Sequence, residues 1–290
     1  MTYEKLLASL TFTKEEKEKI LLTDQRIQEN VPFVYPKLRE AYFTGWEESL
    51  VRISELADQT RIPGALLTLC FFLRFSVEYA HPAYKKLGIS DDIFCATMGN
   101  AEKYVEMTRL KTGRFGILPQ RYFRSICFLL ELDSFRIGTL NFERIRIEKD
   151  LEVDGIQIKQ GECCISVHIP RGSDFSEQTC EKTFAAAKTF FRKYYGLDQV
   201  FCHCWSWLLH PWLSECLGEA SNLVKFQKKF KLYEVSNSQT APLEYVFPEY
   251  WKPEDTSFDH YPENTSLQRI LKERLRKGLP VGAAKGIRLL

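Results

Sequence analysis

The stretch GECCISVHIPRGSDFSEQTCEKTFAAAKTFFRKYYG, residues 161–196, and its continuation QVFCHCWSWLL, residues 199–209, decide the fold. The first ten residues form an apolar run that stops at Pro170, which predicts a strand that ends in a polar loop. Residues 179–195 have the spacing of an amphipathic helix closed by Gly196. A strand over 199–209, a helix over 221–230 and a strand over 231–235 follow. This alternation favours βαβ units and a mostly parallel sheet.

The loop at residues 171–174 joins the first strand to the helix. Backbone N–H groups and the dipole at a helix N-terminus attract anions, and Gly172 would let the backbone approach a ligand closely. Arg171 adds positive charge, whereas Asp174 opposes a phosphate and could instead cap the helix. The loop therefore suits a phosphorylated cofactor such as coenzyme A, with an ordinary strand-to-helix turn as the alternative.

The charge balance excludes several classes of partner. The 290 residues include 40 basic and 38 acidic side chains, a net charge of +2, which gives no general attraction to nucleic acids or anionic membranes. Seven basic residues occur after position 267, but no aromatic side chain follows Tyr261 to stack on bases. We therefore expect neither a nucleic-acid nor a membrane partner.

The nine cysteines favour a reducing compartment. Most lie in apolar runs, and the first residues lack the basic start and apolar segment of an export signal. We therefore expect buried free thiols and a cytoplasmic location. In Cys202-His203-Cys204, strand alternation turns His203 away from both cysteines, so we expect no metal site.

The first 112 residues are expected to be helical. Thr13 and Glu16 form a capping box, a helix is expected over 36–58, and the nearly apolar segment 64–79 predicts a central helix. Ser90 is expected to cap a helix that reaches about residue 111 and ends before Gly113. Residues 118–132 could be a further helix or the first strand of the next domain, with a helix favoured, and we expect domains at 1–120 and 121–290.

The rest of the second domain carries further strand and turn signals. Residues 135–147 alternate as one half-buried strand, which Asp154-Gly155 joins to the strand at 156–167 through a hairpin. Residues 242–250 are expected to be extended, and Thr265 with Gln268 forms a capping box for a helix that ends at Gly278. Residues 284–290 could return as an edge strand.

Several segments resemble a bacterial family of acyltransferases in which a helical N-acyltransferase N-terminal domain precedes a GNAT-like C-terminal domain. The resemblance lies in FRIGTLNFE (135–143), VHIP (167–170), CWSWLL (204–209), Ser221-Asn222 with Phe226 and Phe230, and TSLQR (265–269). It implies an α+β fold, with a helical N-terminal domain followed by a GNAT-like mixed sheet flanked by helices.

The resemblance also implies an activity. The family's chemistry is transfer of an acyl group from acetyl-CoA or another acyl-CoA to an amine-type acceptor by direct attack, and we expect a small-molecule acceptor. The residues expected to bind the cofactor are Val167, Ile169, Arg171, Gly172, Ser173, Ser176 and Asn222.

The catalytic candidates lie at the ends of strands. His168 is beside Pro170, and its imidazole could take a proton from an amine, although a core histidine bonded to a neighbour is the alternative. Glu131 or Glu143 could assist. GNAT-type enzymes often carry a proton-donating tyrosine on the helix that here contains only phenylalanines, and the next tyrosine is Tyr233. Ser206 is therefore a second candidate donor.

A non-catalytic reading comes from the same residues. The glycine-poor loop, the missing helix tyrosine and the lack of an evident acid–base pair fit a GNAT-like ligand-binding or interaction module. Trp205 and Trp207 would share a strand face and, with His210 and Trp212, line an aromatic pocket or a core. A strand end that parts from its neighbour at His168 favours an enzyme, whereas a gap filled by Trp205, Trp207 and His168 favours the module.

Overall fold

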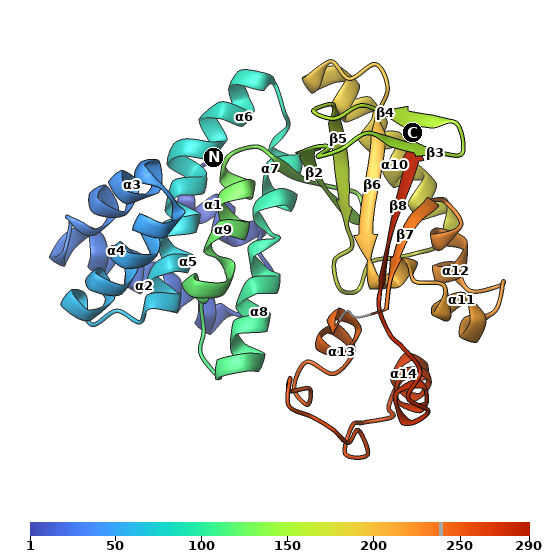
Figure 1. The fold of residues 1–290 in the computed structure, drawn as a ribbon. Coiled ribbons are helices and arrows are strands. Elements are labelled where there is room, and N and C mark those ends of the chain that lie inside the picture. Colours follow the sequence, from blue (N-terminus) through green and yellow to red (C-terminus); the bar gives the residue numbers. More distant parts are fainter. Residues whose placement is uncertain (238–239) are drawn as a thin grey trace. The chain divides into compact units, whose positions relative to one another are not determined.

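The computed structural model describes residues 1–237 and 240–290. The chain divides into two compact units, Met1–Arg136 and Ile137–Leu290. The first consists of helices up to the start of the first strand at Ser134, and the second is a mixed sheet with helices around it (Figure 1). The expected α+β fold is confirmed.

The N-terminal unit is a bundle around one apolar helix. Its elements are α1 (Tyr3–Ser9), α2 (Lys14–Asn30), α3 (Val34–Thr44), α4 (Trp46–Thr60), α5 (Gly64–Phe75), the π-helix η1 (Ser76–Ala80), α6 (His81–Leu87), α7 (Asp91–Met98), α8 (Ala101–Thr112) and α9 (Pro119–Leu130). Every residue of α5 from Ala65 to Leu73 is buried, and α5 packs against α1, α2, α3, α4 and α9. This confirms the central position that its composition predicts.

The predicted caps are present, but two predicted helices are each broken in two. Thr13 and Glu16 form the capping box of α2, and the Ser90 hydroxyl accepts from the Ile93 N–H at the start of α7. The expected helix at 36–58 is interrupted by Gly45, whose φ of +153° is rarely adopted by other residues. The helix that begins after Ser90 ends at Gly99 and resumes as α8, which ends at Gly113 as predicted.

Six strands form the main sheet of the C-terminal unit, in the order β1-β2-β5-β6-β8-β7. Their bounds are β1 (Ser134–Ile137), β2 (Leu140–Arg146), β5 (Cys163–His168), β6 (Phe201–Ser206), β8 (Ala283–Leu289) and β7 (Lys231–Ser236). The prediction of a mostly parallel sheet is wrong. The crossover through α10 (Glu177–Tyr195) makes β5 and β6 parallel, whereas the pairs β2–β5, β6–β8 and β7–β8 are antiparallel.

Other strand predictions also need correction. The single strand expected at 135–147 is two strands, β1 and β2, separated at Gly138, whose φ is +57° and where a Cβ would lie 2.4 Å from Thr183 Oγ1. The Asp154-Gly155 turn is confirmed, but it closes a separate hairpin of β3 (Leu151–Val153) and β4 (Ile156–Ile158). The expected edge strand β8 lies between β6 and β7, since it pairs with both.

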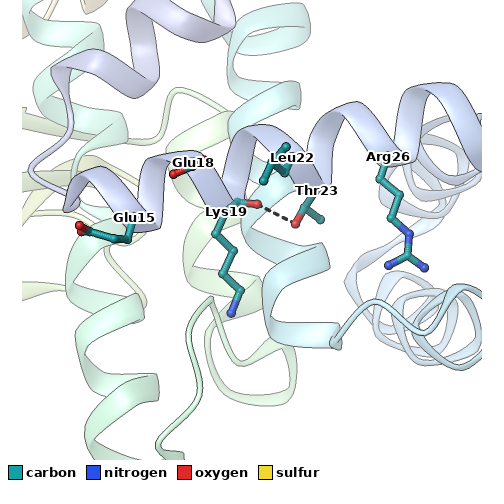
Figure 2. Close-up of a pocket in the computed structure, with 6 residues that line it drawn as sticks. All are labelled: Glu15, Glu18, Lys19, Leu22, Thr23 and Arg26. Carbon is teal, nitrogen blue, oxygen red and sulfur yellow. Dashed lines mark hydrogen bonds between the residues drawn. The ribbon is translucent and has the colours of Figure 1, made fainter.

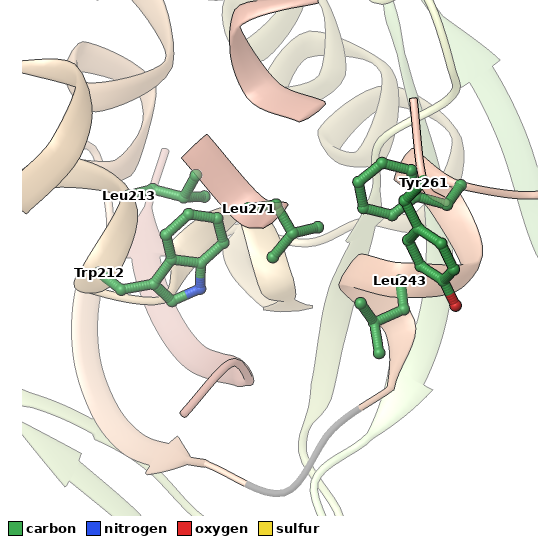
Figure 3. Close-up of a cluster of buried hydrophobic side chains, with 6 residues drawn as sticks. Trp212, Leu213, Leu243, Tyr261 and Leu271 are labelled. Atoms are coloured by element: carbon green, nitrogen blue, oxygen red, sulfur yellow. The ribbon is translucent and has the colours of Figure 1, made fainter. Parts of the chain in front are cut away.

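The C-terminal segment has a core of its own. Residues expected to be extended form helix α13 (Ala241–Val246) instead, because Leu243 buries its side chain in an apolar cluster. The cluster, part of which is shown in Figure 3, joins α11 (Trp212–Leu217) to α13 and α14 (Ser266–Arg276); its buried members are Trp212, Leu213, Leu243, Phe247, Tyr261 and Leu271. The predicted capping box at Thr265 opens α14. The segment between β7 and β8 is thus tied to α11.

Among the described residues no single helix is both long and apolar enough to cross a membrane. The bent pair Trp46–Thr60 and Gly64–Leu87 meets that criterion only by length and composition.

Candidate functional site

The two faces of the sheet have different roles. Phe142 of β2 packs against Phe184 and Phe191 of α10, with ring centroids 6.2 and 6.3 Å apart, and Val167 of β5 lies directly opposite Phe142. Residues opposite each other share a face, and successive residues alternate. Phe142 and Val167 therefore face α10, and the side chains of Glu143 and His168 face the other way.

The face away from α10 is apolar at one end and polar at the other. At the apolar end the β3–β4 hairpin contributes Ile158 to a cluster with Ile147, Cys164 and Ile287. The polar end carries side chains from five strands, β2, β5, β6, β7 and β8. We call it the polar sheet end, and its residues are Glu143, Ser166, His168, His203, Trp205, Tyr233, Glu234 and Lys285.

His168 and Glu143 form a pair at the polar sheet end. His168 Nε2 lies 2.7 Å from Glu143 Oε2, and the side chain of His168 is 48% exposed. Because a carboxylate accepts hydrogen bonds, this contact places a proton on Nε2 and leaves the lone pair on Nδ1. The structure therefore supplies the acid–base pair that the sequence alone did not reveal, on an exposed rather than a core histidine.

Glu131, the other carboxylate considered as an assistant, belongs to the N-terminal unit. There it accepts a hydrogen bond from the Tyr42 hydroxyl at 3.0 Å.

The pairing of β5 with β6 ends beside His168. Within the described residues, the pairing of β5 with β6 covers only Ile165 with Cys202 and Ser166 with His203, although β5 remains paired with β2 as far as His168. Among the described residues, the backbone of β5 beyond Ser166 is therefore not paired with β6. Val167 and Ile169, predicted to bind the cofactor, lie along this stretch.

Trp205 and Trp207, which were expected to share a strand face, do not do so. Strand β6 ends at Ser206, and Trp207 begins the 3₁₀ turn η2 (Trp207–Leu209) and packs against the C-terminal apolar cluster. Trp205 is 56% exposed and lies beside Lys285, whose Nζ is 5.4 Å from its ring. His210 and Trp212 are buried.

The loop between β5 and α10 is ordered by its own side chains. The Asp174 carboxylate accepts from the Ser176 N–H at 2.7 Å and from the Thr179 hydroxyl at 2.7 Å. These hydrogen bonds hold the pKa of Asp174 below its usual range, and the hydrogen bond from Thr179 has the largest effect. Ser173 Oγ lies 2.9 Å from Thr139 O, and Ser176 Oγ lies 2.9 Å from the Asp174 carboxylate. Both predicted serine ligands are therefore already hydrogen-bonded, Ser173 to the turn between β1 and β2 and Ser176 within the loop.

The remaining predicted cofactor residues lie at the surface. Gly172 has a φ of +77°, and no atom lies within 4 Å of where its Cβ would be; Arg171 is exposed. Asn222 is the exposed first residue of α12 (Asn222–Gln227), which contacts α10 through the stacked rings of Phe226 and Phe184.

Ser206, the second catalytic candidate, lies away from His168. Strand alternation puts its side chain on the α10 face, together with Cys202 and Cys204. Its oxygen accepts a hydrogen bond from the Leu208 N–H at 3.1 Å, which caps η2. The structure thus does not bring together the two side chains proposed as catalytic.

A second histidine lies on the same face as His168. His203 Nε2 is 2.9 Å from the hydroxyl of Tyr233. Burial, reinforced by Lys285 and His168 and opposed by Glu234, lowers the pKa of His203 to about 4. Burial, then Glu234, raises the pKa of Tyr233 to about 12. Both side chains are therefore neutral at pH 7. Strand alternation along β5 and β6 could have predicted that His203 and His168 share a face of the sheet. No feature of the sequence predicts that Tyr233 of β7 lies close to His203.

No metal site accompanies the cysteines among the described residues, where no group of three His, Cys, Asp or Glu side chains is placed to hold an ion. Cys202 and Cys204 are buried, and burial raises the pKa of both thiols.

The neutral state of His203 predicts a loss of stability in acid. Its pKa in the folded chain lies below the unfolded value of 6.5, so the unfolded chain gains its proton first as the pH falls. The resulting stability is complete above pH 6.5 and is lost between pH 6.5 and about 4. Between pH 7 and pH 5, we expect the free energy of unfolding of the native chain to fall by about 2 kcal/mol more than that of the His203→Asn variant, as measured by urea denaturation. Equal losses would contradict the assignment.

Figure 2 shows a shallow depression in the N-terminal unit that is separate from these residues. It runs along α2 and is lined by Glu15, Glu18, Lys19, Leu22, Thr23 and Arg26. Acidic and basic side chains are interspersed along it, which gives it no preference for either sign of ligand.

Both parts of the chain match known families. Residues 134–288 match the family described as GNAT-like C-terminal domain, and residues 1–123 match the N-acyltransferase N-terminal domain. No curated protein matches the chain.

Solved acyltransferase structures share the fold. One, in complex with decanoyl-CoA and teicoplanin, has a TM-score of 0.76 and 19% identity, over 99% of this chain and 87% of that one. A variant in complex with octanoyl-CoA has a TM-score of 0.75 and 19% identity over the same shares. A third, in complex with decanoyl-CoA, has a TM-score of 0.64 and 20% identity over 78% of this chain and 66% of that one.

Proposed function

The chain belongs to the acyltransferase family that combines an N-acyltransferase N-terminal domain with a GNAT-like C-terminal domain, and we propose that it transfers an acyl group from acyl-CoA to an amine of a small-molecule acceptor. The observation that carries this proposal is the His168–Glu143 pair beside the point where the pairing of β5 with β6 ends. A base that lies next to unpaired strand backbone is suited to direct attack on a thioester held along that backbone.

His168 acts as the general base. Glu143 holds the proton on Nε2, so Nδ1 takes the proton from the attacking amine. The amine nitrogen forms a bond to the thioester carbonyl carbon, and the carbonyl oxygen gains negative charge. The negative charge on the oxygen is lost when the carbonyl re-forms and the carbon–sulfur bond breaks. CoA leaves as a thiolate, which takes up a proton, and the acceptor leaves as an amide.

Two segments bind the CoA. The backbone of Val167–Ile169 offers hydrogen bonds to an extended, amide-containing arm, as a strand edge does to a peptide. Arg171, the turn at Gly172 and the first N–H groups of α10 bind the phosphates. Asp174 already accepts from one of those N–H groups, so Arg171 carries more of the charge compensation than it would in a glycine-rich loop. Ser173 and Ser176 shape the loop, and Asn222 is the most peripheral member of the site.

The proposed donor includes medium-chain acyl groups as well as acetyl. Structures with the same fold hold octanoyl-CoA and decanoyl-CoA, which supports a test of these lengths. One of these structures also contains teicoplanin, which likewise supports a small-molecule acceptor.

Acyl-CoA binding is expected to stabilise the chain. A ligand present at 100 times its Kd adds about 2.7 kcal/mol to the free energy of unfolding, which thermal denaturation detects for CoA, acetyl-CoA, octanoyl-CoA and decanoyl-CoA. Arg171→Ala should weaken binding of every one of these ligands. Arg192→Ala, an exposed arginine in the last turn of α10, is the control and should bind normally.

No shift in denaturation temperature with any CoA at millimolar concentration would refute the proposal. A positive result leads to the second assay, in which thiol release from the bound acyl-CoA must depend on an added primary amine and yield an amide by mass spectrometry. Binding without amine-dependent thiol release would favour the ligand-binding module instead.

A further inference from the structure

His203 lies at the last residue pair before β5 and β6 part, directly opposite Ser166. Its side chain is on the same face as His168, and His168 contributes to its electrostatic environment. One ring nitrogen, Nε2, contacts the Tyr233 hydroxyl at 2.9 Å. The other, Nδ1, is buried and has no hydrogen-bond partner among the described residues.

The contact with Tyr233 determines which nitrogen carries the proton. A neutral imidazole has one N–H group, and the other nitrogen is an acceptor. A phenol is a much stronger proton donor than a neutral imidazole N–H, and an imidazole nitrogen is a much stronger acceptor than a phenol oxygen. The Tyr233 hydroxyl therefore donates to Nε2, which leaves the hydrogen on Nδ1.

A buried N–H group without an acceptor costs free energy, and such groups in folded proteins need an explanation. At His203 this donor is buried, beside the last residue pair that joins β5 to β6. A donor of this kind is already oriented and desolvated before a ligand arrives, which is the condition for strong stabilisation of a developing negative charge.

We propose that His203 donates a hydrogen bond from Nδ1 to the carbonyl oxygen of the thioester, and that Tyr233 is the positioning residue that keeps the hydrogen on Nδ1. This assignment rests on the acyl transfer proposed above. The acyl group enters between β5 and β6 and provides the acceptor that Nδ1 lacks. The hydrogen bond strengthens as the amine attacks and the oxygen gains charge, and the proton stays on His203 throughout.

The charge state of His203 suits this role. Lys285 of β8 and His168 of β5 disfavour protonation of His203, and Glu234 of β7, which favours it, is already paired with Lys285 at 2.8 Å. A neutral imidazole can donate a hydrogen bond to an oxyanion without first transferring its proton. Ser206 does not compete for this role, because its side chain lies on the opposite face.

Two nearly isosteric replacements test the donor. The amide nitrogen of His203→Asn can occupy the position of Nδ1 and donate, whereas His203→Leu fills similar space without a donor. We expect His203→Leu to lower kcat by about 10² to 10³, with the Kd for acyl-CoA unchanged, and His203→Asn to retain activity within about tenfold of the native chain. Equal activity of the two variants would overturn the proposal.

The tautomer provides a readout that does not depend on turnover. Nitrogen-15 chemical shifts of His203 should show the hydrogen on Nδ1 in the native chain, and Tyr233→Phe should move it toward Nε2. Tyr233→Phe should also lower kcat by roughly tenfold or more without raising KM. A native Nε2–H tautomer would overturn the role of Tyr233 even if His203→Leu does not fold.

Failure of this proposal can be told apart from failure of the proposed function. If no acyl-CoA binds, the acyltransferase proposal is wrong. If acyl-CoA binds and turns over while His203→Leu keeps native kcat, only the role of His203 is wrong.

Discussion

Replacement of His168 by alanine is expected to lower kcat by about 10²- to 10⁴-fold, the range that removal of a general base produces. The Kd for acyl-CoA should change little, because the side chain of His168 contacts Glu143 on the sheet face opposite α10. Without the imidazole, the amine must lose its proton to water. Turnover is measured by thiol release at saturating acyl-CoA, and binding by calorimetry.

Two further variants make this result specific. Glu143→Gln keeps the shape of the partner but removes its charge, so we expect an intermediate loss of about tenfold in kcat, since the imidazole is held less firmly in the required tautomer. His260→Ala removes an exposed histidine from the C-terminal segment and should have native activity. A His168→Ala variant that binds acyl-CoA and turns over at the native rate would exclude His168 as the base.

Local sequence patterns predicted most helices and strands, but they could not determine how the strands pair. The apolar run that stops at Pro170 and the helix closed by Gly196 both appear where their sequences indicate. The order of the sheet does not follow from them. Strand β8 begins after a long segment with its own apolar cluster and then inserts between β6 and β7. Nothing within β8 specifies two partners so distant in the chain.

The same limit applies to the site. His168 could be selected because it ends a strand beside Pro170, whereas its partner depends on the register that places Glu143 opposite Ser166. The sequence indicated one continuous strand over 135–147, where the structure has two strands separated at Gly138, so this register was not evident. Tyr233 lay outside the expected helix and was therefore not assigned a role. Its contact with His203 arises because β7 and β6 both flank β8.

The largest effect on stability is expected in the N-terminal unit, at Asp24. Its buried carboxylate accepts from the Tyr35 hydroxyl at 2.5 Å and the Gln28 amide at 2.6 Å, and forms an ion pair with Arg74. The Arg74 side chain is 18% exposed and its guanidinium lies 4.4 Å from the ring centroid of Tyr3. Asp24→Ala leaves the mostly buried charge of Arg74 with only the exposed Glu78 at 3.8 Å, and leaves the partly buried phenol of Tyr35 without its acceptor. We expect a loss of about 3 kcal/mol in the free energy of unfolding, measured with urea.

A matched control and a double variant distinguish the effect of losing the Asp24–Arg74 ion pair from the effect of any substitution in the same helix. Glu18→Ala removes an exposed carboxylate from the same helix (Figure 2), and should change stability by no more than about 0.5 kcal/mol. Asp24→Leu combined with Arg74→Met replaces both charges with apolar groups, which is often far less costly than removal of one partner. We therefore expect the double variant to be more stable than Asp24→Ala. If the loss of stability in the double variant equals the sum of the losses in Asp24→Leu alone and Arg74→Met alone, then Asp24 and Arg74 do not interact, because only independent sites are additive.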